Sequence, residues 1–365
     1  MRTMGLEFRI AWLVVAAAAA SAAAASRPAA PGPVAEEPPA PKVLHGAPLA
    51  PYMQREQFPS QDKPRFVPAG EARFMKEAEP VIGITAGRAA KAYPVWVLEH
   101  REVVNDTAGE IPVAVTWCSI AGTGIVYRRS VGDRLLTLAS DGSLWKEAQV
   151  LFDRETESRW TQITGEALEG PLDGNRLQAI PSVLTTWGRW KQSHADSLIL
   201  VKGPGWTRSL WDQQYENDPD RLGIAGKTNP DRRLGGKSRV LGIEPGTLGR
   251  NAAIAYVEER PGIVNDVIEG VPVVVVRELL DPAARLFRRT ASGRELHFVR
   301  APSSGAVVDR ETGSIWDLLS GEAVKGRLAG ARLDPVSAVS AYWFVWTTFH
   351  PGSELRPPSS ARQPQ

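Results

Sequence analysis

Residues 150–170 read VLFDRETESRWTQITGEALEG, and residues 306–326 read AVVDRETGSIWDLLSGEAVKG. Both stretches contain Asp-Arg-Glu-Thr, then a serine, a tryptophan, a (Ser/Thr)-Gly-Glu-Ala motif and a glycine, at the same spacing. A single match of this kind would be chance. These two stretches, however, lie within a longer series of matches, and that series decides how the fold is organised.

The series extends over most of the chain. Asn105-Asp106 recurs as Asn265-Asp266, and VYRR (126–129) recurs as LFRR (286–289), each 160 residues later. From Asp153 onward the separation is 156 residues, so the second copy lacks four residues in between. The last matches are Trp160, Trp187, Trp190 and His194, which recur as Trp316, Trp343, Trp346 and His350. An ordered series with one deletion predicts a duplicated domain, because its period is too long for a solenoid repeat or a propeller blade.

Each copy is predicted to consist mainly of strands. IPVAVTW (111–117) and VPVVVV (271–276) are rich in β-branched residues, which favour strands. The Asn-Asp pair before each run predicts a turn, since Asx side chains bond nearby backbone groups.

The Asp-Arg-Glu-Thr motif predicts a tight hairpin rather than a catalytic cluster. We expect Asp153 to accept hydrogen bonds from turn amides and the next strand to carry Trp160 inward. Gly313 suits a positive φ at the turn, whereas Glu157 adopts that conformation at a cost of order 1 kcal/mol.

One short helix is predicted in each copy. Trp187 and Trp190 are three residues apart, as are Trp343 and Trp346, which places each pair on one helical face, where aromatic pairs usually belong to the core. The predicted fold is therefore mainly β (α+β), with two tandem homologous units, each with a short Trp-containing helix. Because duplicated domains often reproduce a dimer, we expect pseudo-twofold packing.

Composition divides the chain into six segments. A charged start followed by an apolar run predicts a signal peptide at 1–26, and a Pro/Ala-rich linker follows at 27–55. The first β-rich unit is expected at 56–203, a connector at 204–239 and the second unit at 240–356, with a disordered tail at 357–365. The protein is thus expected to be exported, periplasmic or secreted, with no membrane span after signal removal.

Charge and cysteine content restrict the classes of function. A net charge of +2 on 365 residues, with no basic stripe, argues against a nucleic-acid partner. Cys118 is the only cysteine, so the chain has no internal disulfide.

Several motifs together resemble a known family. They are PVIGI (80–84), AYP (92–94), VVND (103–106), PVAVTWC (112–118), DRETESRW (153–160), TGEALEGPL (164–172), TTWGRW (185–190), RRLGGKSRVLGI (232–243) and DRETGSIW (309–316). From about residue 59 to residue 355, the chain resembles the exported prokaryotic proteins of domain of unknown function 3179. The resemblance implies the fold and export, and it carries no established activity.

The chain departs from the family pattern at two places. Relatives have a histidine where this chain has Arg101, with His100 one residue early, and they have Cys-Pro-Leu-Cys-Gly where it has CSIAG (118–122). A histidine with Cys-x-x-Cys would suit a soft metal or a redox role. This chain keeps at most half of such a site.

Cys118 and His100 are the candidate metal ligands. Their counterparts in the second copy are Glu278 and Arg260, so the repeat breaks its own pattern here. A thiolate and an imidazole suit copper or zinc, although these ions usually take three or four ligands. The alternatives are a buried structural thiol beside a surface histidine, or a Cys/His nucleophile pair with no third group to orient it.

Two other groups of residues are candidates for binding or catalysis. Paired carboxylates for a hydrolase are offered by Asp106, Asp153, Glu155 and Glu166, which recur as Asp266, Asp309, Glu311 and Glu322. Recurrence in both copies favours turns and salt bridges over an active site. Trp206 and Trp211 have no counterparts and are the candidates for stacking on a ligand, the alternative being a strap that packs across the two units.

Three functions follow from these features. The leading hypothesis is an exported, non-catalytic binding or scaffold protein of the cell envelope, with a degenerate site in its first unit and an envelope component or small ligand as partner. The second is a copper- or zinc-binding or redox protein that uses Cys118 and His100. The third is a hydrolase that acts on envelope polymers through paired carboxylates.

Overall fold

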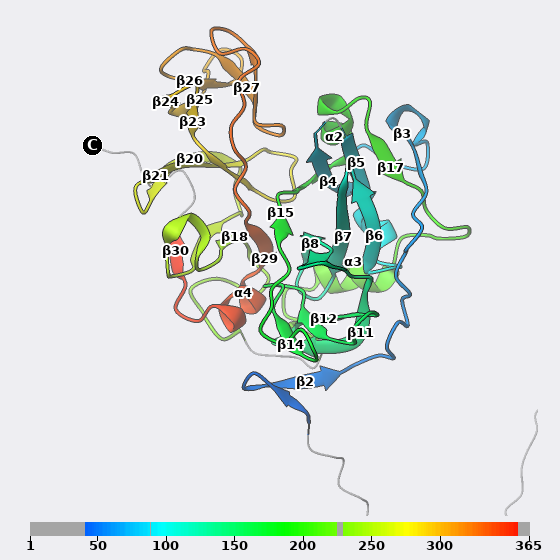
Figure 1. Ribbon diagram of the computed structural model, residues 1–365. Coiled ribbons are helices and arrows are strands. Elements are labelled where there is room, and N and C mark those ends of the chain that lie inside the picture. The colour runs from blue at the N-terminus through cyan, green and yellow to red at the C-terminus, as the bar shows by residue number, and fades with distance from the viewer. Residues whose placement is uncertain (1–40, 88, 225–228, 357–365) are drawn as a thin grey trace, which may run out of the picture. The chain divides into compact units, whose positions relative to one another are not determined.

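The computed structural model describes residues 41–87, 89–224 and 229–356 (Figure 1). The predicted signal peptide (1–26), the linker residues before 41 and the tail (357–365) lie outside these described residues. The described part of the chain is mainly β, as predicted. It also contains four α-helices, namely α1 (Val95–Leu98), α2 (Trp187–Ser193), α3 (Leu210–Asn217) and α4 (Trp343–Phe349).

We call residues 41–203 the N-terminal half. Its first sheet has the order β16-β4-β5-β17-β3, from β3 (Phe66–Pro68), β4 (Pro80–Ala86), β5 (Ala89–Pro94), β16 (Val183–Thr186) and β17 (Leu198–Leu200). Its second has the order β15-β8-β7-β6, from β6 (Val103–Ala108), β7 (Ile111–Cys118), β8 (Thr123–Arg128) and β15 (Ala179–Ile180). Its third has the order β1-β2-β11-β12-β13-β14, from β1 (Val43–Leu44), β2 (Ala47–Pro51), β11 (Leu138–Trp145), β12 (Ala148–Asp153), β13 (Arg159–Thr161) and β14 (Ala167–Glu169). A short ladder joins β9 (Ser130–Val131) and β10 (Arg134–Leu135).

We call residues 239–356 the C-terminal half. One sheet has the order β29-β18-β19-β30, from β18 (Arg239–Ile243), β19 (Ile254–Val257), β29 (Val339–Tyr342) and β30 (Glu354–Arg356). Another has the order β20-β21-β22, from β20 (Gly262–Ile268), β21 (Val271–Arg277) and β22 (Arg285–Arg288). A third has the order β25-β26-β27-β28, from β25 (Phe298–Arg300), β26 (Val307–Asp309), β27 (Ile315–Asp317) and β28 (Glu322–Lys325). A short ladder joins β23 (Thr290–Ala291) and β24 (Arg294–Glu295).

Corresponding strands of the two halves pair in the same way. In the β6–β7 hairpin Asn105 lies opposite Ala114, and in the β20–β21 hairpin Asn265 lies opposite Val274. The β17 strand runs parallel to β5, and β30 runs parallel to β19, whereas the other named pairs are antiparallel.

The predicted turn at each Asn-Asp pair is wrong, because both residues lie inside a strand. The Asn105 side chain is buried, accepts from the Leu138 N–H at 3.1 Å and donates to the Leu138 carbonyl at 2.8 Å. Asn265 makes the same two bonds to Phe298, at 2.8 and 2.9 Å. The asparagine therefore fastens one strand to the next sheet by satisfying two backbone groups that would otherwise be unpaired.

The hairpin predicted for the Asp-Arg-Glu-Thr motif is confirmed. Asp153 is fully buried and accepts from the Thr156 N–H at 2.6 Å and from the Trp160 indole at 2.9 Å. Asp309 accepts the equivalent pair of bonds at the same distances. As expected, Glu157 has a φ of 59° and Gly313 a φ of 69°.

The two predicted helices and their buried tryptophans are also confirmed. Trp187 and Trp190 on α2 are buried, as are Trp343 and Trp346 on α4. The Trp190 ring lies so close to Gly83 that a Cβ there would approach it to 2.1 Å. The sheet therefore needs glycine where the helix crosses it.

Residues 41–55, assigned by composition to the linker, contain two strands. The β2 strand pairs with β11, and the Trp145 indole donates to the Leu44 carbonyl at 2.9 Å. Leu44 and Leu49 are buried beside that ring. Two leucines thus supply a small core within a segment whose proline content predicted none. The remaining segment boundaries stay predictions.

The two halves share packed surfaces. One buried apolar cluster includes Tyr127 and Trp160 from the N-terminal half with Val240 and Trp343 from the C-terminal half. The backbone N–H of Tyr342 also donates to the Ala121 carbonyl at 2.9 Å. No helix in the described part of the chain has the length and apolar character needed to cross a membrane.

Candidate ligand-binding cleft

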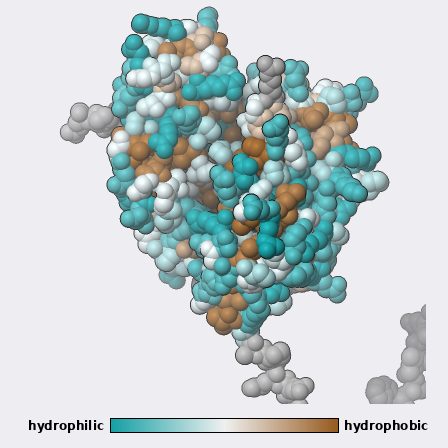
Figure 2. Space-filling view, viewed as in Figure 1, coloured by the Kyte–Doolittle hydropathy of each residue, from teal (hydrophilic) through white to brown (hydrophobic). Residues whose placement is uncertain are grey.

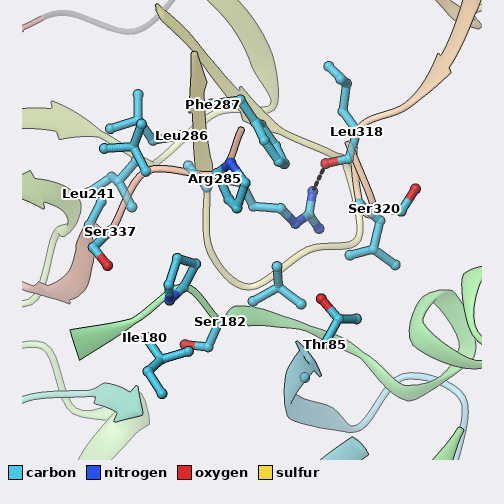
Figure 3. Close-up of a pocket in the computed structure, with 18 of the residues that line it drawn as sticks. Thr85, Ile180, Ser182, Leu241, Arg285, Leu286, Phe287, Leu318, Ser320 and Ser337 are labelled. Carbon is cyan, nitrogen blue, oxygen red and sulfur yellow. Dashed lines mark hydrogen bonds between the residues drawn. The ribbon is translucent and has the colours of Figure 1, made fainter. Parts of the chain in front are cut away.

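A cleft of about 1230 Å³ is lined by residues of both halves. Figure 2 shows apolar side chains gathered in the middle of one face of the molecule, among mostly hydrophilic ones. Figure 3 shows Thr85, Ile180 and Ser182 of the N-terminal half facing Arg285 and Phe287 of the C-terminal half. A volume of this size exceeds that of most small-molecule sites, which run to about 1,000 Å³.

Positions that correspond in the two halves line the cleft together. Tyr127 and Phe287 are one such pair, and Arg176 and Arg332 are another. The correspondence breaks where Ile125 is matched by Arg285. It also breaks where Thr85, which follows VIGI (81–84), is matched by Glu244, which follows VLGI (240–243). At these two places the charged residue belongs to the C-terminal half, whereas Arg189 of the N-terminal half lines the cleft and corresponds to the uncharged Val345.

Asp281 is a buried carboxylate that joins the two halves. It forms an ion pair with Arg285, which is also buried and donates to the Leu318 carbonyl at 3.4 Å (Figure 3). From the N-terminal half, the Thr185 hydroxyl donates to Asp281 at 2.5 Å, and the Arg189 Nε lies 3.5 Å away. Removal of either partner would leave an uncompensated buried charge, which strongly destabilises a folded protein.

A second ionic contact across the cleft joins Arg176 to Glu244. Their nearest nitrogen and oxygen atoms are 3.1 Å apart, and Arg176 also pairs with Glu166 at 3.0 Å. Burial raises the pKa of the Glu244 carboxyl to about 7, because loss of solvent disfavours its charged form. Glu244 therefore titrates near neutral pH.

Several lining residues have a buried polar atom without a partner among the described residues. These atoms are Thr164 Oγ1, Arg189 Nε, His194 Nδ1, Glu244 Oε1 and Arg285 Nε. Buried polar groups are normally hydrogen-bonded, so this set indicates a place where water or a ligand supplies the missing partners.

The structure gives Cys118 and His100 different neighbours. Cys118 is buried at the end of β7 among Ile120 and Ala121, and burial raises the pKa of its thiol to about 11. The thiolate that a metal or a nucleophilic reaction needs is therefore scarce at neutral pH. His100 donates from Nε2 to the Thr207 carbonyl at 2.6 Å. Among the described residues, no group of three or more His, Cys, Asp or Glu side chains is arranged to hold a metal ion.

The candidate hydrolytic carboxylates each have structural partners. Asp106 accepts from Lys91 at 2.7 Å and from the Tyr93 hydroxyl at 2.6 Å. Glu155 accepts from the Thr137 N–H at 2.7 Å, and Glu166 is the partner of Arg176 described above. Their counterparts Asp266, Glu311 and Glu322 pair with Arg356, His297 and Arg332.

The two candidate stacking tryptophans are partly covered. Trp206 is stacked by the His100 ring, with centroids 4.9 Å apart, and the Arg101 guanidinium lies 4.7 Å from its ring centroid. Trp211 is 38% exposed and stacks on Tyr215 with centroids 5.2 Å apart. Neither tryptophan lines the cleft.

The sequence did not point to Glu244 and Arg285 of the cleft, or to Asp281, the buried partner of Arg285. Asp281 and Arg285 stand where the first copy has Ala121 and Ile125, and Glu244 stands where it has Thr85. The signal in the sequence was a gain of charged residues in the second copy. The candidate metal ligands were instead identified from residues present only in the first copy, Cys118 and His100.

Comparison with family models gives one match, over residues 55–353. No significant match was found among curated proteins or among solved structures. The matched region covers most of the chain, including both walls of the cleft. The chain therefore belongs to the family described as "Protein of unknown function (DUF3179)".

Proposed function

We propose that this chain is an exported, non-catalytic binding protein of the cell envelope, whose ligand occupies the cleft. The observation that carries the proposal is the set of unpartnered buried polar atoms in a cleft lined by both halves. The carboxylates considered for catalysis have structural partners, which favours binding over hydrolysis.

The proposal includes two tandem homologous units packed with pseudo-twofold symmetry. Matched hydrogen bonds support it: the Trp190 indole donates to Ser197 Oγ at 3.0 Å, and the Trp346 indole donates to Ser353 Oγ at 2.9 Å. The matched strand orders and asparagine bonds support it as well. A cleft on such an axis receives similar side chains from both sides.

The chemistry of the lining favours a mainly uncharged ligand. Each arginine of the lining is already paired with a carboxylate, so an anionic ligand would find no free guanidinium. Hydroxyl groups and aliphatic side chains alternate on the walls, as at Ser182, Leu241 and Ser337 (Figure 3). Ligands with hydroxyl or amide groups fit this mixture.

Export rests on residues 1–26, whose pattern of charge and apolar residues is that of a secretory signal. Mass spectrometry of the protein recovered from the periplasm tests it. We expect a mature N-terminus near residue 27, and an intact residue 1 would contradict export by cleavage.

Binding is tested by native mass spectrometry against a defined panel of muropeptides and neutral oligosaccharides. We expect wild type to retain at least one class, and Ser182→Trp, which places a bulky side chain on one wall of the cleft, to lose it. Thr290→Trp on the exposed β23–β24 ladder is the matched control and should bind as wild type. Equal binding by wild type and Ser182→Trp would contradict the proposed site.

A further inference from the structure

A second, smaller cavity lies outside the cleft. It has a volume of about 310 Å³ and is lined by residues 60–62, Arg65, Arg101 and residues 201–204 with Trp206. None of these residues belongs to the cleft lining.

Backbone hydrogen bonds fix the walls of this cavity. The Gln61 N–H donates to the Val103 carbonyl at 2.9 Å, and the Gln61 carbonyl accepts from the backbone N–H of Asn105 at 3.0 Å. On the other side, the Val201 N–H donates to the Arg65 carbonyl at 2.8 Å. The side chains therefore project from paired backbone rather than from loose loops.

One carboxylate lines the cavity, and its charge is already balanced. Asp62 pairs with Arg154, which also pairs with Glu56. Asp62 further accepts from the Ser60 hydroxyl at 2.8 Å and from Asn105 at 2.7 Å. These three charged groups together carry a single net negative charge.

Three cations line the same cavity. The Arg65 side chain has no ion-pair partner among the described residues. Arg101 donates to the Pro59 carbonyl at 3.3 Å and stacks over Trp206, and Lys202 donates to the Trp206 carbonyl at 3.3 Å. Carbonyl partners leave the charges of Arg101 and Lys202 unneutralised. With the net negative charge of the Asp62 group, the surroundings carry two uncompensated positive charges.

A hydrogen phosphate ion matches the charge of this cavity, because it carries two negative charges. Arginine and lysine are the usual partners of phosphate oxygens.

We propose that this cavity is an oxyanion site for a phosphate-sized group, held by Arg65, Arg101 and Lys202. The Trp206 ring, which stacks on His100, contacts the Arg101 guanidinium and so helps to position it. The bound group is either free phosphate or the phosphate of a larger ligand.

The test is isothermal titration calorimetry with inorganic phosphate at low salt and about pH 8, where phosphate is mostly dianionic. Removal of one charge-assisted contact by Arg65→Gln or Lys202→Gln should weaken binding about tenfold. Arg294→Gln, at an exposed arginine of the C-terminal half, is the control and should bind as wild type. Circular dichroism verifies that each variant is folded.

A parallel titration with glucose 1-phosphate separates the two sources of the phosphate. Tighter binding of the ester than of the free ion assigns a phosphorylated ligand, and equal or weaker binding assigns free phosphate. Absence of binding by both probes, or equal affinity in wild type, Arg65→Gln and Lys202→Gln, would overturn the proposal. The cleft variant Ser182→Trp should bind phosphate normally, so this site and the proposed function fail independently.

Discussion

The two halves use the same framework and differ in what they place on it. Matched hydrogen bonds at nearly the same distances are made by Asn105 and Asn265, by Asp153 and Asp309, and by Trp190 and Trp346. These residues fasten strands to one another. Their repetition identifies them as structural.

The two halves differ at positions that lie between these shared structural residues. Cys118 and Ser140 of the N-terminal half are both buried, and at the corresponding places Glu278 and Arg300 form an ion pair at 2.7 Å. Likewise, Ala121 and Ile125 are matched by the buried pair Asp281 and Arg285. At both places the charged pair belongs to the C-terminal half, and Glu278, Arg285 and Arg300 line the cleft.

The largest expected effect comes from breaking the buried ion pair. Asp281→Ala leaves Arg285 buried without its carboxylate and should lower the free energy of unfolding by about 3–5 kcal/mol. Urea denaturation measures the change. The double variant Asp281→Ala/Arg285→Ile installs the residues of the first copy and should recover much of the loss. A double variant as unstable as the single one would show that the ion pair is not the cause.

The next effect should appear in both halves. Asn105→Ala and Asn265→Ala each leave two buried backbone groups unpaired, at a cost of about 2 kcal/mol. Asn175→Ala, at an exposed asparagine, is the control and should change stability little. A large loss in one half only would separate the roles of the two asparagines.

The turn residues should respond in opposite directions. Glu157→Gly relieves a positive φ and should stabilise the protein by up to about 1 kcal/mol, whereas Gly313→Glu should destabilise it by a similar amount. Thermal unfolding of both variants measures these shifts. Changes of the same sign would contradict the strain argument.

Glu244 predicts a dependence of stability on pH. Because its pKa is about 7 in the folded protein and lies near 4.5 when unfolded, the folded state binds the proton more tightly. Proton binding by Glu244 contributes fully to the stability of the folded state below about pH 4.5, and this contribution is lost as the pH rises through 7. Glu244→Gln should therefore gain stability relative to wild type, on the order of 1 kcal/mol, between pH 5 and pH 8. Parallel pH profiles for the two proteins would contradict the raised pKa.

The smallest expected effect is on metal content. The copper- or zinc-binding hypothesis for Cys118 and His100 stays a prediction, and elemental analysis of wild type against Cys118→Ser tests it. Because the thiol is buried and its pKa is raised, we expect equal metal content. A loss of copper or zinc in the variant would restore the metal hypothesis.

Local residue patterns predicted much of the framework, because each depends on neighbours in the sequence. The Asp153 hairpin and the Trp187–Trp190 helix face are of this kind. The strand position of Asn105 was mispredicted, since its partner Leu138 is far away in sequence and a free asparagine side chain favours turns. The cleft could not be predicted for the same reason: Asp281 meets Thr185 only after both halves have folded.

We infer that both halves contribute to one ligand site. The most direct measurement is the binding stoichiometry of the retained muropeptide or oligosaccharide by native mass spectrometry, in wild type, Ser182→Trp and Ser337→Trp, which alter opposite walls of the cleft. We expect one ligand per chain in wild type and loss of binding in both variants. Two ligands per chain, or undiminished binding in either variant, would contradict it.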